Sequence, residues 1–174
     1  AASARMLGRS LASIAAIALG LGTCGAALGL LLSYHLNVAS GATATVALVL
    51  SGPGGLAKAG AGTLVLEAAG SYGGATTVQG GSLRAGAANM LTSVSAHEVQ
   101  ASGVLDLDGL AQTVASLVNA GTVRLPRNGA PAVPGTTLSV TGNYSGGGVL
   151  AMATQLGNEA SPSDRLVVNG SVTA

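Results

Sequence analysis

Aromatic and charged side chains are scarce in this chain of 174 residues. It contains three Tyr, no Phe and no Trp, and charged residues make up 7% of it, against about 25% in an ordinary soluble domain. A coiled coil needs many Glu, Lys and Arg side chains, so that class is excluded. A net charge of +1 and the shortage of aromatic rings for base stacking argue against nucleic-acid binding.

Side chains that bind metals or form disulfides are equally scarce. Cys24 is the single cysteine, which excludes a disulfide scaffold. His35 and His97 are the only two histidines, and no cluster of further ligands accompanies either of them. The sequence therefore predicts no metal site and no cofactor. We expect His97, which Glu98 follows, to lie in a solvated turn or at a strand edge.

An apolar stretch occupies the first fifty residues. Arg5 and Arg9 precede an uncharged run that includes residues 11–32, a length of 22 residues, and about 20 are needed to cross a bilayer as a helix. A basic start followed by an apolar run is also the pattern of an export signal. Residues 1–50 are thus predicted to be a signal-like or transmembrane helix, and the pattern leaves both readings open.

Part of this stretch resembles a family of membrane transporters. Residues 29–43 read Gly-Leu-Leu-Leu-Ser-Tyr-His-Leu-Asn-Val-Ala-Ser-Gly-Ala-Thr, and they resemble the late membrane helices of metal ABC transporter permeases. Asn37 stands where that family often has an acidic residue, and Ala39 stands where it often has Pro. The resemblance implies a permease remnant, held in the inner membrane and joined to another protein.

From residue 51 onward, short runs alternate between apolar and polar residues. Residues 63–67, 82–85 and 105–108 all show this period of two, which is typical of short, half-buried strands. In the last of these runs we expect both Leu side chains to point inward and both Asp side chains, Asp106 and Asp108, to point outward.

The spacing between these strands predicts a repeat architecture. Leu64, Leu83, Leu105 and Val123 follow one another at intervals of 19, 22 and 18 residues. The segments between them are rich in Gly, which excludes helices. We therefore predict an all-β fold, a right-handed parallel β-helix, in which each coil holds two or three strands. Val94 is among the expected strand positions.

The pattern changes beyond residue 125. Pro126, Pro131 and Pro134 cluster there, and Pro cannot donate a hydrogen bond within a central ladder. We expect an interruption of the coil, which divides the β-helix into residues 51–134 and a distinct C-terminal part at residues 135–174. Residues 166–168, Leu-Val-Val, are apolar throughout and are expected to be buried on both faces.

Residues 55–83 resemble a repeat of secreted bacterial proteins. Gly-Leu-Ala-Lys-Ala-Gly-Ala-Gly-Thr-Leu at residues 55–64 is followed by Tyr-Gly-Gly-Ala-Thr-Thr-Val at 72–78 and Gly-Gly-Ser-Leu at 80–83. This order is similar to the autotransporter-associated β-strand repeat of type V secretion passengers. Rungs that commonly follow such repeats are similar to residues 103–107, 112–114 and 121–123.

The C-terminal part resembles another segment of the same proteins. Residues 138–144 and 161–170 are similar to the junction, or autochaperone, region of pertactin-like passengers, most clearly at Ser-Pro-Ser-Asp-Arg-Leu, residues 161–166. The resemblance implies an exported passenger, displayed on the cell surface or outer membrane or secreted. It also implies a structural or adhesive role, with a C-terminal part that assists folding.

Partners follow from the same resemblance. It implies a C-terminal translocator β-barrel, outer-membrane assembly machinery and a host or cell-surface ligand of unknown identity. Because the chain ends at Ala174, before any such barrel, we expect it to be truncated or a passenger-like remnant.

Asp106 and Asp108 are the one pair of residues whose chemistry suggests catalysis. Two carboxylates can cleave a glycoside, so Asp106 and Asp108 make a β-helix enzyme acting on polysaccharides the alternative function. Outward polar residues that keep a strand soluble explain the pair more simply. Asp164 and Arg165 are expected to form a local ion pair or turn contact. The sequence thus predicts no catalytic residues and no enzyme.

Overall fold

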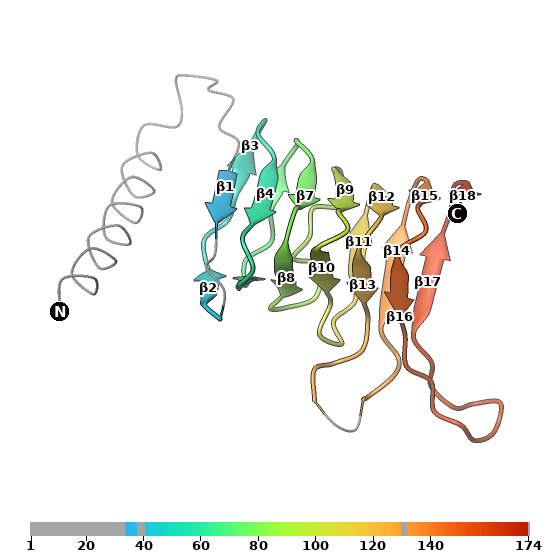
Figure 1. Cartoon of the computed structure of the whole chain (residues 1–174). Coiled ribbons are helices and arrows are strands. Elements are labelled where there is room, and N and C mark those ends of the chain that lie inside the picture. The colour runs from blue at the N-terminus through green and yellow to red at the C-terminus, as the bar shows by residue number, and fades with distance from the viewer. Residues whose placement is uncertain (1–33, 38–40, 130–131, 174) are drawn as a thin grey trace. The chain divides into compact units, whose positions relative to one another are not determined.

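The described part of the chain consists of stacked coils of parallel strands. The computed structural model describes residues 34–37, 41–129 and 132–173, and every element it assigns there is a β-strand (Figure 1). The predicted apolar helix at residues 11–32 lies outside the described residues.

Two long sheets form two faces of the coil. In spatial order, the first sheet contains β1 (Tyr34–Asn37), β4 (Leu56–Ala59), β7 (Thr76–Val78), β9 (Ala96–Val99), β12 (Ser116–Asn119), β15 (Tyr144–Ser145) and β18 (Val172–Thr173). The second sheet contains β2 (Thr43–Val46), β5 (Thr63–Leu66), β8 (Gly81–Ala85), β10 (Gly103–Asp106), β13 (Thr122–Arg124) and β16 (Val149–Ala151).

The third face is divided in two. One part pairs β3 (Ser51–Gly52) with β6 (Ser71–Tyr72), and the other contains β11 (Gln112–Val114), β14 (Thr137–Val140) and β17 (Arg165–Val168). The chain visits the first sheet, the second sheet and the third face in turn, and neighbouring strands in all sheets are parallel. This arrangement confirms the predicted parallel β-helix.

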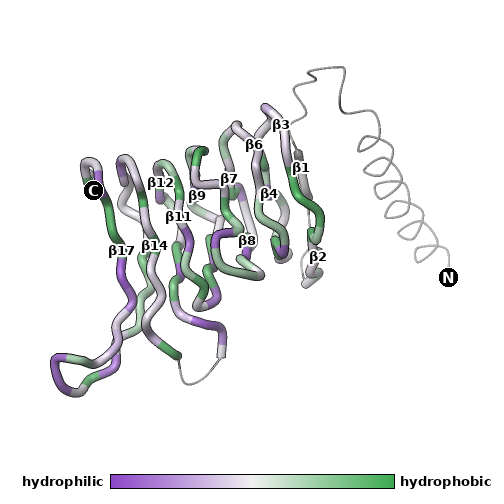
Figure 2. Tube along the Cα trace, turned by 180° about the vertical axis from the view of Figure 1, so that it is seen from behind, coloured by the Kyte–Doolittle hydropathy of each residue, from purple (hydrophilic) through white to green (hydrophobic). Residues whose placement is uncertain are grey.

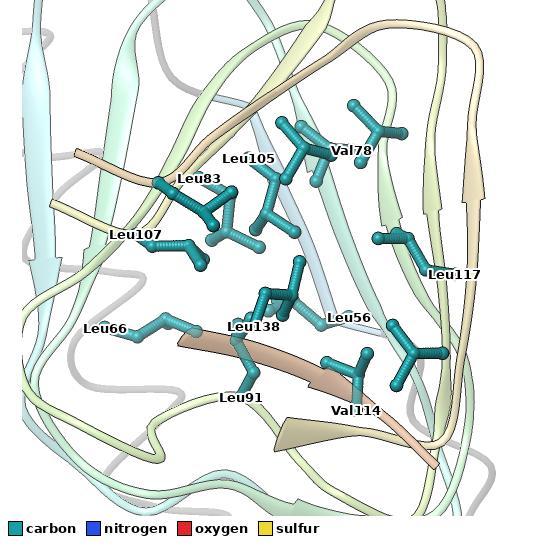
Figure 3. Packing of buried hydrophobic residues seen from close by; sticks show 14 of the residues in the cluster. Leu56, Leu66, Val78, Leu83, Leu91, Leu105, Leu107, Val114, Leu117 and Leu138 are labelled. Carbon is teal, nitrogen blue, oxygen red and sulfur yellow. The ribbon is translucent and has the colours of Figure 1, made fainter. Parts of the chain in front are cut away.

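The predicted repeat spacing is confirmed residue by residue in the second sheet. Leu64 lies beside Leu83, Leu83 beside Leu105, and Leu105 beside Val123. All four side chains are at most 1% exposed, and Figure 3 shows Leu83 and Leu105 in the apolar interior. Each buried side chain of this size stabilises the fold by about 1.5–3 kcal/mol. The stack of similar aliphatic residues therefore fills a narrow interior without large rings.

The turn from the first to the second sheet depends on Gly. A Cβ atom at Gly103 would lie 2.3 Å from the carbonyl oxygen of Val78, and one at Gly121 would lie 2.2 Å from that of Gln100. Both distances are far below contact, so no larger residue fits without moving the backbone. Gly81 and Gly148, at the same corner of other coils, are equally close to backbone oxygens.

The third face has no strand between residues 86 and 95. Leu91, 3% exposed, fills the interior there. Its backbone N–H donates to the side-chain oxygen of Gln112 at 3.1 Å, and the amide nitrogen of Gln112 donates to the carbonyl of Ala87 at 2.8 Å. The expectation of a strand position at Val94 is wrong, because this loop leaves Val94 72% exposed.

The coil continues past the proline cluster. β14 lies between β11 and β17, and β16 pairs with β13, so the expected interruption is wrong. Pro126 and Pro134 lie instead in a loop between β13 and β14 that projects from the coil (Figure 1), where no ladder bond is needed. A second projecting loop, between β16 and β17, is largely hydrophilic (Figure 2).

The two ends of the stack also differ from expectation. Val167 points outward and is 42% exposed, whereas Leu166 and Val168 point inward and are only partly buried because β17 ends its sheet. The expected burial of residues 166–168 on both faces is therefore wrong. At the other end, β1 and β2 pair with β4 and β5. These strands therefore lie within residues 1–50, ahead of the position at which the first coil was expected.

Candidate functional site

Lys58 closes a corner of the repeat from inside. It follows Leu56 with the period of two, so it points into the coil, where its side chain is 0% exposed. Its ammonium donates to the carbonyl oxygens of Ala59 at 2.9 Å, Gly60 at 2.8 Å and Gly80 at 2.9 Å. All three N–H groups are thus satisfied, and burial lowers the pKa of Lys58. This Lys is the one that the repeat resemblance contains.

A tyrosine joins two successive coils. The Tyr72 hydroxyl and the Thr76 hydroxyl lie 2.7 Å apart, and the Thr92 hydroxyl donates to the Tyr72 carbonyl at 3.3 Å. Tyr72 is 0% exposed, and this burial raises its pKa. The hydrogen bonds satisfy the polar end of a ring that otherwise packs in the apolar core.

Asn119 has a role like that of Lys58 further along the same inward row. Val78 and Val99 separate the two residues in register. The Asn119 amide donates to the Val149 carbonyl at 3.1 Å and to the Tyr144 hydroxyl at 3.3 Å. It therefore links its coil to the corner of the next, although its own side-chain oxygen has no hydrogen-bond partner.

His97 lies inside the coil, so the expected solvated position is wrong. It stands in register between Thr76 and Leu117 and is 2% exposed. Nδ1 lies 3.1 Å from the Ser95 carbonyl, and Nε2 has no partner. Burial lowers the pKa of His97 to about 4, against which the contact with Ser95 is a smaller effect. The ring is therefore neutral at pH 7.

Asp106 and Asp108 organise a turn. The Asp108 backbone N–H donates to one Asp106 carboxylate oxygen at 3.1 Å, and the Asn128 amide donates to the other. The Asn128 backbone N–H donates to Asp108 at 2.7 Å. Asp108 adopts a φ of 47°, a left-handed conformation that Asp tolerates in turns.

This arrangement changes the expected orientation of one carboxylate. Asp106, expected to point outward into solvent, is only 6% exposed, because the loop after β13 folds over it. The carboxylates are thus held by hydrogen bonds to Asn128, a residue that the sequence reasoning missed. The Asn-Gly pair at residues 128–129 marks a turn, but its distant partners could not be inferred.

Asp164 gathers three backbone N–H groups in the C-terminal coils. One carboxylate oxygen accepts from Gly135 at 2.9 Å and Thr136 at 2.8 Å, and the other accepts from Ala153 at 2.8 Å. Asp164 is 4% exposed. The predicted turn contact is confirmed rather than an ion pair, and it joins the ends of both projecting loops.

A polar groove of about 330 Å³ crosses the outer side of the second sheet. Its walls carry Glu67, Arg84, Asp108 and Arg127. These residues lie on, or within three residues after, β5, β8, β10 and β13, which are consecutive strands of that sheet. The groove therefore follows the direction in which the coils stack.

Within residues 34–37, 41–129 and 132–173, no group of three or more His, Cys, Asp or Glu side chains is placed to hold a metal ion. In the same ranges no helix is long and apolar enough to span a membrane.

Comparison with protein families agrees with the motif and the fold. The passenger-associated-transport-repeat model matches residues 56–85, the part that Lys58 and Tyr72 hold together. The model of the autochaperone domain type 1 matches residues 112–174, from β11 to the end of the chain. The described β-helix is autotransporter passenger sequence. A third model, of the ABC 3 transport family, matches residues 1–51, in agreement with the permease resemblance.

Two relatives support the passenger assignment. The Adhesin BmaC autotransporter of Brucella suis biovar 1 (strain 1330) is 39% identical over 109 residues, which are 62% of this chain and 3% of that protein. The Uncharacterized protein YuaQ of Escherichia coli (strain K12) is 30% identical over 122 residues, which are 70% of this chain and 9% of that protein. The passenger chain thus spans less than a tenth of either relative.

Proposed function

We propose that this passenger segment is displayed at the cell surface or secreted, and that residues 135–174 assist its folding. The observation that carries the proposal is the bonding of Asp164, whose partners Gly135, Thr136 and Ala153 all lie in the C-terminal coils. These coils can therefore close without the N-terminal ones. Once closed, they offer strand edges on which the preceding coil pairs.

The strand pairing supports the same order of assembly. β14 pairs with β17 over four residues and β15 pairs with β18, so the last two coils form a ladder among themselves. On their other side, β14 and β15 pair with β11 and β12. Growth of the coil from the C-terminal end thus needs only contacts between neighbouring coils.

Folding kinetics of two matched variants test this role. Leu138 in β14 and Leu64 in β5 are both 0% exposed, and truncation of either to Ala should cost about 2–5 kcal/mol. If the C-terminal coils form first, Leu138→Ala slows refolding, whereas Leu64→Ala mainly accelerates unfolding. Refolding and unfolding rates in urea measure the difference.

The reverse pattern would contradict the proposal. Slower refolding in Leu64→Ala with an unchanged refolding rate in Leu138→Ala would place the nucleus at the other end. A Leu166→Asp variant extends the test to β17. It should impair folding of the whole coil, and an unfolding midpoint equal to that of the parent would argue against templating.

The remaining roles are also proposals. An adhesive role is supported by the relative named as an adhesin, and a translocator barrel with assembly machinery is the partner that passenger sequence implies. Inner-membrane attachment through residues 11–32 is the alternative supported by the transporter match. Finding the uncleaved segment in the inner membrane would favour it, and a mature N-terminus beyond residue 32 would remove it.

We propose no catalytic activity for the chain. The bonding of both Asp106 oxygens and of Asp108 within a turn supports a structural role for this pair. Turnover of a polysaccharide that disappears in Asp106→Asn would instead establish the enzyme alternative.

A further inference from the structure

The charged residues of this sparsely charged chain are gathered on one side. Six of the eleven charged residues in the described ranges lie in or beside the polar groove. Four of them line it, and the other two, Asp106 and Arg124, occupy neighbouring register positions of the second sheet. Of these six residues only Asp106 is buried, and the other five are partly or fully exposed. They therefore form a charged surface that a ligand can reach.

The positive groups of this groove are the ones left free. Neither Arg84 nor Arg127 forms an ion pair or hydrogen bond within the described part of the chain. By contrast, Asp106 and Asp108 already accept bonds from Asn128 and from the turn backbone. Among the wall residues, Glu67 alone is an unbonded carboxylate. The groove therefore offers more unused donors than acceptors, which favours an anion.

Two glycines keep the floor of the groove open. A Cβ atom at Gly86 would lie 2.9 Å from Cγ of Glu67, and one at Gly109 would lie 2.9 Å from Cβ of Arg127. Gly109 also has a φ of +77°, which L side chains rarely adopt. Both residues line the groove. Glu67 and Arg127 therefore pack against Gly backbone, and no side chain at these two positions fills the groove.

We propose that this groove binds the carboxylate or sulfate groups of an acidic polysaccharide. A guanidinium is a planar fork of donors that matches such anions. The strand β10 lies between β8, which carries Arg84, and β13, which Arg127 follows. At about 4.8 Å per strand, the two positions are about 10 Å apart along the stack. An extended polymer that repeats its anionic group along its length can therefore meet both. The inference rests on the surface display proposed above and adds to it a class of ligand.

Binding of defined oligosaccharides to the full chain tests the proposal. Oligomers of polygalacturonate and heparin carry carboxylate and sulfate groups, and dextran is the neutral control. Titration calorimetry at low and at physiological salt should give binding of one or both anionic oligomers, weakened by salt, and none of dextran. The double variant Arg84→Gln/Arg127→Gln should raise Kd at least tenfold, with an unchanged unfolding midpoint.

Three results would overturn the proposal that the groove binds this ligand. The first is absence of binding to both anionic oligomers, and the second is equal binding of dextran or duplex DNA. The third is an equal loss of affinity in Arg165→Gln, which removes a positive charge on β17 outside the groove. If the double variant is unfolded, the single variant Arg84→Lys is tested in its place. Lys keeps the positive charge but lacks the planar pair of guanidinium donors, so a Kd equal to that of the parent would overturn the proposal. If the chain refolds with the kinetics expected above but binds none of the oligosaccharides, the binding proposal is overturned and the proposed folding role of residues 135–174 is not.

Discussion

Single polar residues inside the coil determine how its turns are held. Lys58, Asn119 and Asp164 each direct side-chain hydrogen bonds to backbone groups of a neighbouring coil or loop. A buried polar group that lacks such partners costs about 1–3 kcal/mol. His97 differs from them, because the contact of its ring is with Ser95, two residues away, and its Nε2 is buried without a partner, as is the side-chain oxygen of Asn119.

The stability of the coil should fall between pH 8 and pH 5 because of His97. Its folded pKa of about 4 lies below the unfolded value of about 6.5, so the unfolded chain takes up the proton first. Stability is full above pH 6.5 and is lost as the pH falls toward 4, with about 2 kcal/mol lost by pH 5. Urea unfolding at both pH values measures this loss.

A leucine at the same position provides the control. In a chain that also carries His35→Asn, so that no second imidazole titrates, His97→Leu should show equal unfolding free energies at pH 5 and pH 8. A variant that retained the full loss would show that another group is responsible.

At the scale of the strand and its corner, backbone spacing decides which residue fits. The second sheet begins at a Gly in several coils because the preceding coil brings a carbonyl oxygen to the place of a Cβ atom. The strand itself needs only alternation, and its inward positions accept Leu or Val in register. Corner positions thus accept fewer residue types than strand positions do.

Replacing a corner glycine should destabilise the coil far more than replacing an open one. Gly103→Ala forces the backbone of two coils apart at Val78 and should cost about 1–3 kcal/mol. Gly73→Ala meets no atom within 4 Å and has no positive φ, so its effect should stay within about 0.5 kcal/mol. Thermal unfolding of both variants checks this, and equal costs would contradict the corner argument.

The strands and their register could be predicted from the sequence, whereas the long-range polar contacts could not. Period-two alternation and the interval of about 20 residues place Leu64, Leu83 and Leu105 correctly, because both depend on local chemistry. The inward position of Lys58 follows from the same alternation with Leu56, so that signal was present. The partners of Asn128 and Asp164 lie 11 to 29 residues away, and no pattern in the sequence marks them. The proline cluster misled because a projecting loop and a broken ladder have the same composition.

At the scale of the whole described region, the coils form a one-dimensional stack. Each strand pairs only with the coil before and the coil after it, so stability is approximately a sum of coil and neighbour terms. Lateral contacts in this stack are continuous through β11, β14 and β17. The backbone connection from β13 to β14 is longer than these lateral contacts, because it runs through the projecting loop that carries Pro126 and Pro134.

We therefore expect the coils to stay together when the backbone is cut in that loop. Arg127 is exposed there, so limited trypsin treatment should cut after it. The ladders from β11, β12 and β13 to β14, β15 and β16 should keep the two pieces associated. They are expected to run separately on a denaturing gel and together in native size-exclusion chromatography, whereas dissociation in native buffer would mean that the loop is needed. Because the coils do not depend on an intact backbone in this loop, we expect the loop to tolerate an inserted peptide. The strands β13 and β14 on either side would then hold that peptide at a fixed position along the axis of the stack.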